Sequence, residues 1–178
     1  MKSPPSEYPL RHTWVAYMDQ SFQNLTQVSA FDSISTFWRY FNNVPPCSQL
    51  KHQCSHRIFR QGIQPMSEDA QNIAGGMWTA RVTDKTLTDA AALEAILATV
   101  GQTLSPDGDV NGLVIGGRRL DDRISLWTRY GGRDDRQQRL GNRLRELVPG
   151  AESIVFKLHQ DSVQQSNHAF LAKEVLKA

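Results

Sequence analysis

Two arginines near the middle of the chain have a spacing that could bind an anion. The segments Val110–Arg118 and Arg123–Thr128 flank a short polar turn, which predicts a β-hairpin in which Arg118 lies opposite Arg123. Like charges in directly opposed positions destabilise a sheet. An anion held between the two guanidinium groups removes that conflict, so the pair indicates a site for a negatively charged ligand.

An aromatic ring accompanies these cations on the second strand of the hairpin. Because side chains alternate across a strand, Arg123, Ser125 and Trp127 fall on one face, and Ile124 and Leu126 fall on the other. The first face combines a cation with an aromatic ring, whereas the second is typical of a core. The simpler interpretation is a solvated hairpin tip with a buried Trp.

A third candidate is Gly62–Asp69, an apolar turn with a proline that carries the carboxylate of Glu68. The pair Gly75–Gly76 then leads into a predicted strand that contains Trp78. A single Glu in a loop is most often only exposed to solvent, so its surroundings decide whether it contacts a ligand.

Length and composition limit the classes of protein to consider. A chain of 178 residues is long enough for one domain with a core. Charged residues make up 21% and the net charge is +2, so any nucleic acid should be bound locally rather than along a basic stripe. No apolar run approaches the ~20 residues of a membrane span. The N-terminus lacks an apolar signal core and the chain has two cysteines, so we expect a cytoplasmic protein.

One group of residues suggests a metal, but only weakly. Cys47, His52, Cys54 and His56 have a spacing that is not a usual zinc-finger pattern, and their alternation equally fits an extended segment. No Ser–His–Asp arrangement, phosphate-binding loop or locally supported carboxylate pair is visible. We therefore expect no enzymatic activity, no metal and no cofactor.

Apolar periodicity predicts three helices separated by strands. Asp32 or Ser33 should cap the first helix, and Thr88 or Asp89 the second, which should end at Gly101. The helical stripes are Ile34, Phe37, Trp38 and Phe41; Leu93, Ile96, Leu97 and Val100; and Leu140, Leu144, Leu147 and Val148. The predicted strands are His12–Met18, Met77–Val82, Val110–Ile115, Ile124–Thr128 and Ile154–Leu158. This irregular order favours an α+β fold, with an antiparallel sheet and helices on one face.

Several separate motifs, in order, resemble the eukaryotic translation initiation factor 4E family. They are Tyr8–Pro9–Leu10 leading to Trp14, Phe31–Asp32 leading to Phe37–Trp38, the turn around Glu68, and Ile124–Ser125–Leu126–Trp127–Thr128. The resemblance covers nearly everything after residue 8. It implies a strongly curved antiparallel sheet with a slot for the 7-methylguanosine cap of messenger RNA on the concave face and helices on the convex face. We expect residues 1–7 to be a disordered lead and residues 8–178 to be a single cap-binding domain.

The resemblance assigns roles to the candidate residues. Glu68 would accept two hydrogen bonds from the guanine edge, Trp127 would contact the N7-methyl group, and Arg118 and Arg123 would hold the phosphates. These groups match the chemistry of a flat, cationic base that carries a triphosphate.

The stacking rings are where the chain departs from the family. Phe22 is the available ring in the loop after the first strand. The family's second ring precedes the carboxylate, but Ser67 stands there in this chain. Met66 could supply a polarizable surface instead, and Trp78 is a further candidate. Ser67 and the short chain resemble the small paralogues of trypanosomatid parasites.

Two further regions receive roles from the family. The segment Ser166, Asn167 and His168 falls where the family contacts the outer phosphates or the second nucleotide. A dorsal patch would bind a helical partner of the initiation factor 4G type or a 4E-binding repressor. The predicted dorsal residues are Pro9, Ile34, Trp38, Leu93 and Leu97. The simpler interpretation of the dorsal stripes is that they only pack the helices onto the sheet.

The sequence thus predicts a monomeric, non-enzymatic cap-binding factor that recruits a partner for translation initiation. One alternative is a repressor or adaptor of the same fold with weak or altered cap binding. Another is a hydrolase acting on capped ends, which would need a metal site that the sequence lacks.

Overall fold

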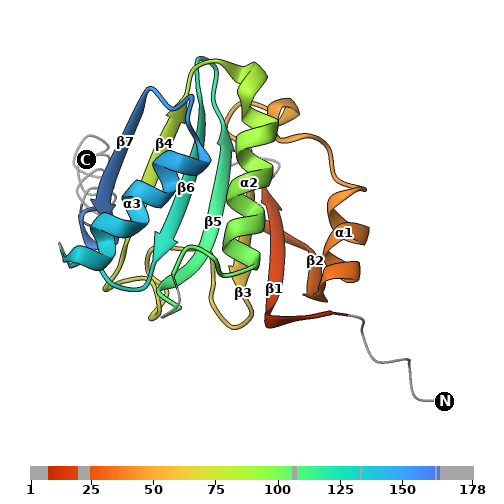
Figure 1. Ribbon diagram of the computed structural model, residues 1–178, viewed down its shortest axis with the longest axis horizontal. Coiled ribbons are helices and arrows are strands. Elements are labelled where there is room, and N and C mark those ends of the chain that lie inside the picture. Colours follow the sequence, from red (N-terminus) through yellow and green to blue (C-terminus); the bar gives the residue numbers. More distant parts are fainter. Residues whose placement is uncertain (1–7, 20–24, 106–107, 133, 163, 165–178) are drawn as a thin grey trace, which may run out of the picture.

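Seven strands form one antiparallel sheet in the computed structural model, in the order β2-β1-β3-β5-β6-β4-β7 (Figure 1). The structure describes residues 8–19, 25–105, 108–132, 134–162 and 164, so the predicted lead, residues 1–7, lies outside them. The predicted α+β class is confirmed. The strands are β1 (Pro9–Asp19), β2 (Leu25–Ser33), β3 (Ser55–Arg60), β4 (Gly76–Val82), β5 (Val110–Gly117), β6 (Asp122–Thr128) and β7 (Ser153–Leu158).

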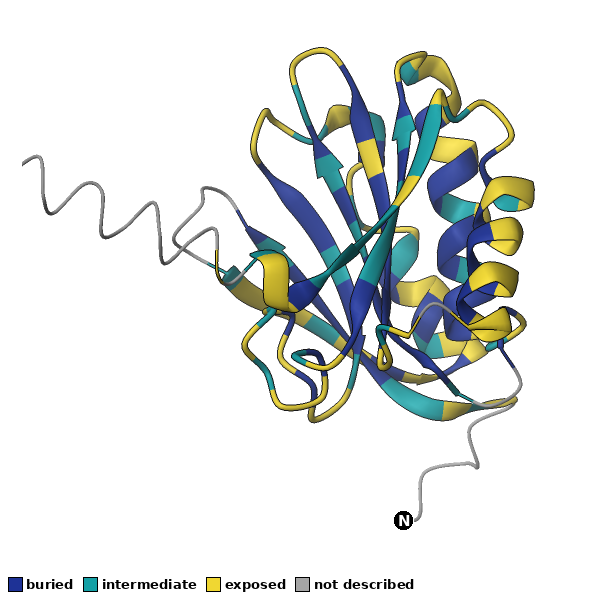
Figure 2. Ribbon diagram, turned by 90° about the vertical axis from the view of Figure 1, so that its left-hand side faces the viewer, coloured by how far each residue is buried: buried dark blue, intermediate teal, exposed yellow. Residues whose placement is uncertain are grey.

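Three helices cover the convex face of this sheet and turn their buried sides toward it (Figures 1 and 2). They are α1 (Ile34–Phe41), α2 (Thr88–Val100) and α3 (Asp135–Leu147). Two 3-10 turns, η1 (Cys47–Gln49) and η2 (Lys85–Leu87), precede β3 and α2. None of the described helices is long and apolar enough to cross a lipid bilayer.

The pleat of the strands sorts apolar side chains into two clusters of unequal size. The larger cluster fills the space between the sheet and the helices, because every second residue of each central strand points there. Its fully buried members include Trp14, Ile58, Leu113, Ile124 and Leu126. The smaller cluster lies on the concave face and consists of Val15, Tyr17, Phe59, Ile63 and Trp127.

The first helix begins at the predicted cap but buries a different set of residues. Ser33 caps α1 in a capping box with Thr36, which confirms one of the two predicted cap residues. Phe37 and Tyr40 are the buried residues of α1. Trp38 was predicted to lie on the apolar stripe with Phe37, yet it is exposed at the surface. Tyr40, outside the predicted stripe, joins Phe37 in the core, and Trp38 stays at the surface, as the predicted dorsal patch requires.

The second and third helices follow their predicted patterns more closely. In α2, Ile96 and Val100 are buried, and the helix ends at Gly101 as predicted. The hydroxyl of Thr88 does not cap this helix, because it donates to the buried carboxylate of Asp122 at 2.8 Å. In α3, Leu140 and Leu144 are buried.

Two strands were not predicted, and each lacks a strong local signal. β2 forms an edge of the sheet, and most of its residues are exposed or half-buried. β3 is central but short, and it carries charged residues as well as apolar ones. β2 pairs with β1, its neighbour along the chain, and β3 pairs with both β1 and β5, so partner strands that local periodicity does not reveal hold both in place.

Candidate functional site

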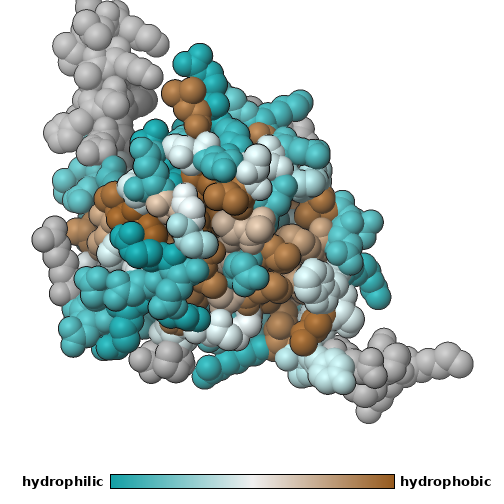
Figure 3. Space-filling view, turned by 45° about the horizontal axis from the view of Figure 1, so that its top comes forward, coloured by the Kyte–Doolittle hydropathy of each residue, from teal (hydrophilic) through white to brown (hydrophobic). Residues whose placement is uncertain are grey.

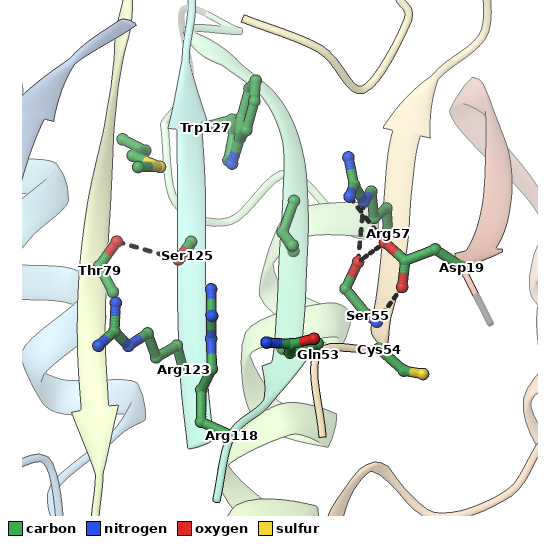
Figure 4. Close-up of a pocket in the computed structure, with 13 residues that line it drawn as sticks. Asp19, Gln53, Cys54, Ser55, Arg57, Thr79, Arg118, Arg123, Ser125 and Trp127 are labelled. Atoms are coloured by element: carbon green, nitrogen blue, oxygen red, sulfur yellow. Dashed lines mark hydrogen bonds and ion pairs between the residues drawn. The ribbon is translucent and has the colours of Figure 1, made fainter. Parts of the chain in front are cut away.

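A pocket of about 200 Å³ opens on the concave face of the sheet, on the side away from the helices (Figure 4). Strands β3, β4, β5 and β6 supply most of its lining. The larger side chains around it include Arg57, Met77, Arg118, Arg123 and Trp127. The pocket thus combines cationic groups with an aromatic ring, as the hairpin pattern predicts.

The alternation predicted along β6 is confirmed. Arg123, Ser125 and Trp127 line the concave pocket, whereas Ile124 and Leu126 are completely buried in the core under the helices. Antiparallel pairing with β4 and β5 on both sides holds β6 in this orientation. The pleat therefore places a cation and an aromatic ring on one open surface.

Trp127 is fixed at one end of the pocket by aromatic contacts. The ring of Phe59 meets it edge-on, with centroids 5.3 Å apart and an interplanar angle of 79°. Only 7% of Trp127 is exposed, and its buried Nε1 has no hydrogen-bond partner among the described residues. A ligand that reaches the exposed edge of this ring would meet a preorganised aromatic surface.

The predicted pairing of Arg118 with Arg123 is wrong. Arg123 lies opposite Gly116 in β5, and Asp122 lies opposite Gly117. The reason is that Asp122 is buried and accepts hydrogen bonds from Thr88 at 2.8 Å and Lys85 at 3.0 Å, which holds it within the ladder. Arg118 consequently lies in the turn rather than opposite Arg123.

A like-charged pair nevertheless exists on the other side of β6. Arg123 lies opposite Arg81 of β4. The carboxylate of Asp121 lies 2.6 Å from Nε of Arg81 and 3.7 Å from Nε of Arg123, so it offsets their repulsion. One carboxylate thus serves two arginines, and the bond to Arg81 is the shorter one. Arg123 therefore keeps much of its capacity to bind another anion.

Arg118 is the other cation available to an anion. Its main chain is fixed, since its N–H donates to Asp121 and its carbonyl accepts from Lys85. Within the described part of the chain, its guanidinium group has no hydrogen bond or ion pair. Figure 4 shows Arg118 and Arg123 rising along the same side of the pocket. The two residues therefore share the pocket, although they are not cross-strand partners.

The turn that carries Glu68 is held in shape by its own side chains. Asp69 accepts from the N–H groups of Gln64 and Gln71 at 3.0 and 2.8 Å. The amide of Asn72 donates to the carbonyls of Gln64 and Met66 at 2.8 and 2.9 Å. These hydrogen bonds close the turn from both sides, so its shape exists before any ligand arrives.

Within this turn the candidate contact residues face outward. Glu68 is exposed and its carboxylate has no partner among the described residues. Met66 is 49% exposed, and Ser67 is half-buried. A carboxylate presented in this way is free to accept hydrogen bonds from a ligand.

His159, which the sequence analysis did not identify, connects this turn to Trp127. Its ring lies on Trp127 with centroids 4.1 Å apart, and its Nδ1 is 3.4 Å from the hydroxyl of Ser67. His159 is completely buried, and burial lowers its pKa to about 4. Its ring is therefore neutral at pH 7 and adds no charge beside the pocket. Since one histidine at a strand end has no sequence signal, only the folded structure reveals this contact.

Trp78 does not belong to this site. It lies between Met77 and Thr79, which line the concave pocket, so the pleat directs it to the convex face. There its Nε1 donates to Gln137 of α3 at 3.0 Å, and its ring packs close to Gly141. The interpretation of Trp78 as a stacking ring is wrong, since Trp78 anchors α3 to the sheet.

Some predicted contact residues cannot be placed. Phe22, Ser166, Asn167 and His168 lie outside the described residues. Asp19, which ends β1, is the last described residue before the segment that contains Phe22.

The cysteines and histidines considered for a metal are separated by the sheet. Cys54 lines the concave pocket, whereas His56 lies on the convex side, where its Nε2 is hydrogen-bonded to the hydroxyl of Tyr40. Burial lowers the pKa of His56 to about 4 and raises the pKa of Cys47 to about 12, which keeps both groups uncharged at pH 7. Both groups therefore have the properties of core residues.

The predicted dorsal residues lie around α1 and α2 on the convex side. Ile34 and Trp38 are 45% and 36% exposed, so the simpler interpretation that they only pack α1 onto the sheet is wrong for these two residues. Leu93 and Leu97 are half-buried on α2, and Pro9 is exposed and paired with Ser33, next to the start of α1. Figure 3 shows apolar side chains gathered near the centre of the face that it views, with polar side chains around them.

Comparison with known proteins agrees with this architecture. Residues 9–174 match the family described as eukaryotic initiation factor 4E. The chain belongs to the initiation factor 4E family. The chain is 30% identical to initiation factor 4E of Dictyostelium discoideum over 169 residues, which covers 90% of this chain and 68% of that protein. Initiation factor 4E-3 of Caenorhabditis elegans is 32% identical over 173 residues, covering 88% of this chain and 68% of that protein.

Solved structures of initiation factor 4E proteins have the same fold. The complex of C. elegans initiation factor 4E-3 with the 4E-binding protein Mextli and a cap analog matches with a TM-score of 0.82 and 32% identity, covering 88% of this chain and 95% of that one. Ascaris suum initiation factor 4E-3 in complex with the m2,2,7G cap matches with a TM-score of 0.79 and 29% identity, covering 85% and 91% of the two chains.

The contact of Ser67 with His159 yields a testable prediction about the place where the family carries a second ring. We expect Ser67→Trp to lower the free energy of unfolding by about 1–3 kcal/mol, because the larger side chain meets the buried imidazole. In a His159→Gly background the same substitution should cost less, because the space is free. Urea unfolding of the four proteins measures both effects, and an equal cost in the two backgrounds would contradict the contact.

Proposed function

We propose that this protein binds the 7-methylguanosine cap of messenger RNA on its concave face and a helical partner on its convex face. It would act in the cytoplasm as a non-enzymatic factor of translation initiation. The observation that carries this proposal is the connection of the Glu68 turn, through Ser67 and His159, to Trp127 in a pocket with two arginines.

Each part of a cap has a matching group in this arrangement. The exposed carboxylate of Glu68 can accept two hydrogen bonds from the N1 and N2 hydrogens of guanine. The indole of Trp127 has an electron-rich π system, which suits contact with a positively charged, methylated base. Arg118 and Arg123, which both line the pocket, can bind the triphosphate.

Related structures support the same assignment. The similar structures are initiation factor 4E-3 of C. elegans in complex with Mextli and a cap analog, and initiation factor 4E-3 of Ascaris suum in complex with the m2,2,7G cap. The exposed pair Ile34 and Trp38 supports a partner site on α1 of the present chain. A groove of about 350 Å³ is lined in part by Phe41, Val44 and Leu93, and the ring of Phe41 contacts Trp38. This groove offers room for apolar side chains of a partner helix.

A repressor or adaptor with weak cap binding is the second candidate function. It is favoured by Ser67, which offers no π surface where the family has its second ring. A base–aromatic stack contributes roughly 1–3 kcal/mol, so a slot with one such wall missing should bind more weakly. Measured cap affinity separates the two candidates, whereas both require the convex partner site.

The first prediction tests the carboxylate. We expect Glu68→Gln to weaken binding to immobilised 7-methylguanosine triphosphate by roughly tenfold to a hundredfold, because two charge-assisted hydrogen bonds lose their acceptor charge. Glu94→Gln is the matched control, since Glu94 is exposed on α2 at the convex side. Retention of a folded Glu68→Gln protein equal to that of the wild type would disprove the base assignment.

The second prediction separates phosphate contacts from base contacts. Arg118→Ala and Arg123→Ala should weaken binding of 7-methylguanosine triphosphate by roughly tenfold or more, and binding of the bare nucleoside much less. Trp fluorescence titration with both ligands measures the difference. Arg145→Ala, an exposed substitution on α3, should change neither affinity. Equal losses for the two ligands would place these arginines at the base instead.

The third prediction concerns the convex face. Trp38→Ala should remove binding of an initiation factor 4G-type helical peptide, with a loss of about 2 kcal/mol or more, typical of an aromatic interface residue. Cap affinity should stay within a few-fold of wild type, because α1 lies on the convex side of the sheet (Figure 1), whereas the pocket lies on the concave side (Figure 4). Calorimetry with both ligands tests this, and a partner that binds Trp38→Ala as tightly as wild type would exclude this surface.

A further inference from the structure

Arg57 of β3 connects three separate segments at the edge of the concave pocket. Its Nη2 donates to the carboxylate of Asp19 in β1 at 2.7 Å, and its Nη1 donates to the carbonyl of Pro65 at 2.8 Å. Its Nε donates to the hydroxyl of Ser55 at 2.9 Å. Figure 4 shows the links to Asp19 and Ser55 beside the pocket.

The carboxylate of Asp19, which accepts from Arg57, makes further hydrogen bonds in the same cluster. Asp19 is only 7% exposed, and it also accepts from the backbone N–H and the hydroxyl of Ser55. A buried carboxylate with several donors and a guanidinium group with an acceptor at each nitrogen form a rigid unit. Asp19 lies on β1 and Arg57 lies on β3, and these two strands pair in the sheet, so the unit is held by the sheet itself.

This rigid unit reaches the turn that carries Glu68 through the hydrogen bond from Arg57 to the carbonyl of Pro65. Pro65 belongs to the turn that carries Met66, Ser67 and Glu68, and its carbonyl lies just before Met66. The hydrogen bonds of Asp69 and Asn72 fix the shape of that turn, but they are internal to it. Arg57 ties the turn to the sheet at Pro65, before Glu68. On the other side of Glu68, Asn111 of β5 makes a second attachment, at Gln71 and Asn72.

Arg57 differs in this respect from the two arginines that we assign to phosphates. The charge of Arg57 is already balanced by Asp19, and each of its nitrogens has a protein acceptor. Among the described residues, the guanidinium group of Arg118 has no such partner, and Arg123 has only the longer contact to Asp121. Although Arg57 lines the same pocket, its hydrogen bonds argue against a role as a third phosphate ligand.

We infer that Arg57 is a positioning residue, which clamps the carbonyl of Pro65 and so fixes the distance between Glu68 and Trp127 across the base site. This inference rests on the proposed function of that site. Asp19 and Ser55 act through Arg57, because they hold its guanidinium group in the orientation that reaches Pro65.

The experiment compares two ligands and one ligand-free measurement. We expect Arg57→Met to weaken binding of 7-methylguanosine and of its triphosphate by the same factor, roughly tenfold, the value of one charge-assisted hydrogen bond. Amide hydrogen exchange of the free protein should become at least tenfold faster for the N–H groups of Asp69, Asn72 and Gly75. Exchange in β5 and β6 should not change. Arg145→Met is the matched control.

A second variant keeps the test decisive if Arg57→Met folds poorly. Arg57→Lys retains a cation beside Asp19 but lacks the planar fork that reaches two acceptors in different directions. It should accelerate exchange in the turn while leaving urea unfolding close to that of wild type. Asp19→Asn should weaken binding alone, but add little in the Arg57→Met background, because the two residues act as one unit.

Each alternative outcome has a distinct meaning. A loss confined to the triphosphate would overturn the inference and make Arg57 a phosphate ligand. Unchanged exchange in the turn would also overturn it, whatever the affinities. If the wild type binds neither ligand, the proposed function fails, but faster exchange in the two Arg57 variants would still establish the clamp.

Discussion

The alternation of side chains across one antiparallel sheet is the constraint on which the rest of this structure depends. The helices cover one face completely, so alternate residues of the central strands must be apolar there. The other face is then free to carry Arg123, Ser125 and Trp127 on β6, between residues that are fully buried. The core and the candidate site are thus two sides of the same strands, and a slip of one residue would exchange them.

Acidic residues decide how the arginines of the pocket are presented. Asp122 is buried and bonded to Thr88 and Lys85, and this fixes the end of the β5–β6 hairpin. Asp121 offsets the repulsion between Arg81 and Arg123. The net charge of the whole chain is only +2, so the positive character of the concave face is local. Such a site attracts a short polyanion rather than a long stretch of nucleic acid.

The turn around Glu68 illustrates how much of a binding site can be predicted from sequence. The proline-containing segment Gly62–Asp69 predicts a turn that carries the carboxylate of Glu68, and the structure shows this residue exposed. Its attachment does not follow, because Arg57 lies on β3 and His159 directly follows β7, far away in the sequence. His159 occupies space beside Ser67 and Trp127, and its neutral ring is compatible with a cationic base nearby. At the proposed base site, this chain therefore has Ser67 with the neighbouring ring of His159 where the family has its second stacking ring.

The sequence by itself determined the features that depend on neighbours along the chain. These are the three helices, a cap at Asp32 or Ser33, the end at Gly101, and the two faces of β6. Only the tertiary structure decided the register of Arg118 and Arg123, the convex position of Trp78, and the exposure of Trp38. The reason is physical: periodicity is a local property, whereas register and burial depend on which distant groups, such as Thr88 for Asp122 and Gln137 for Trp78, compete for the same side chain.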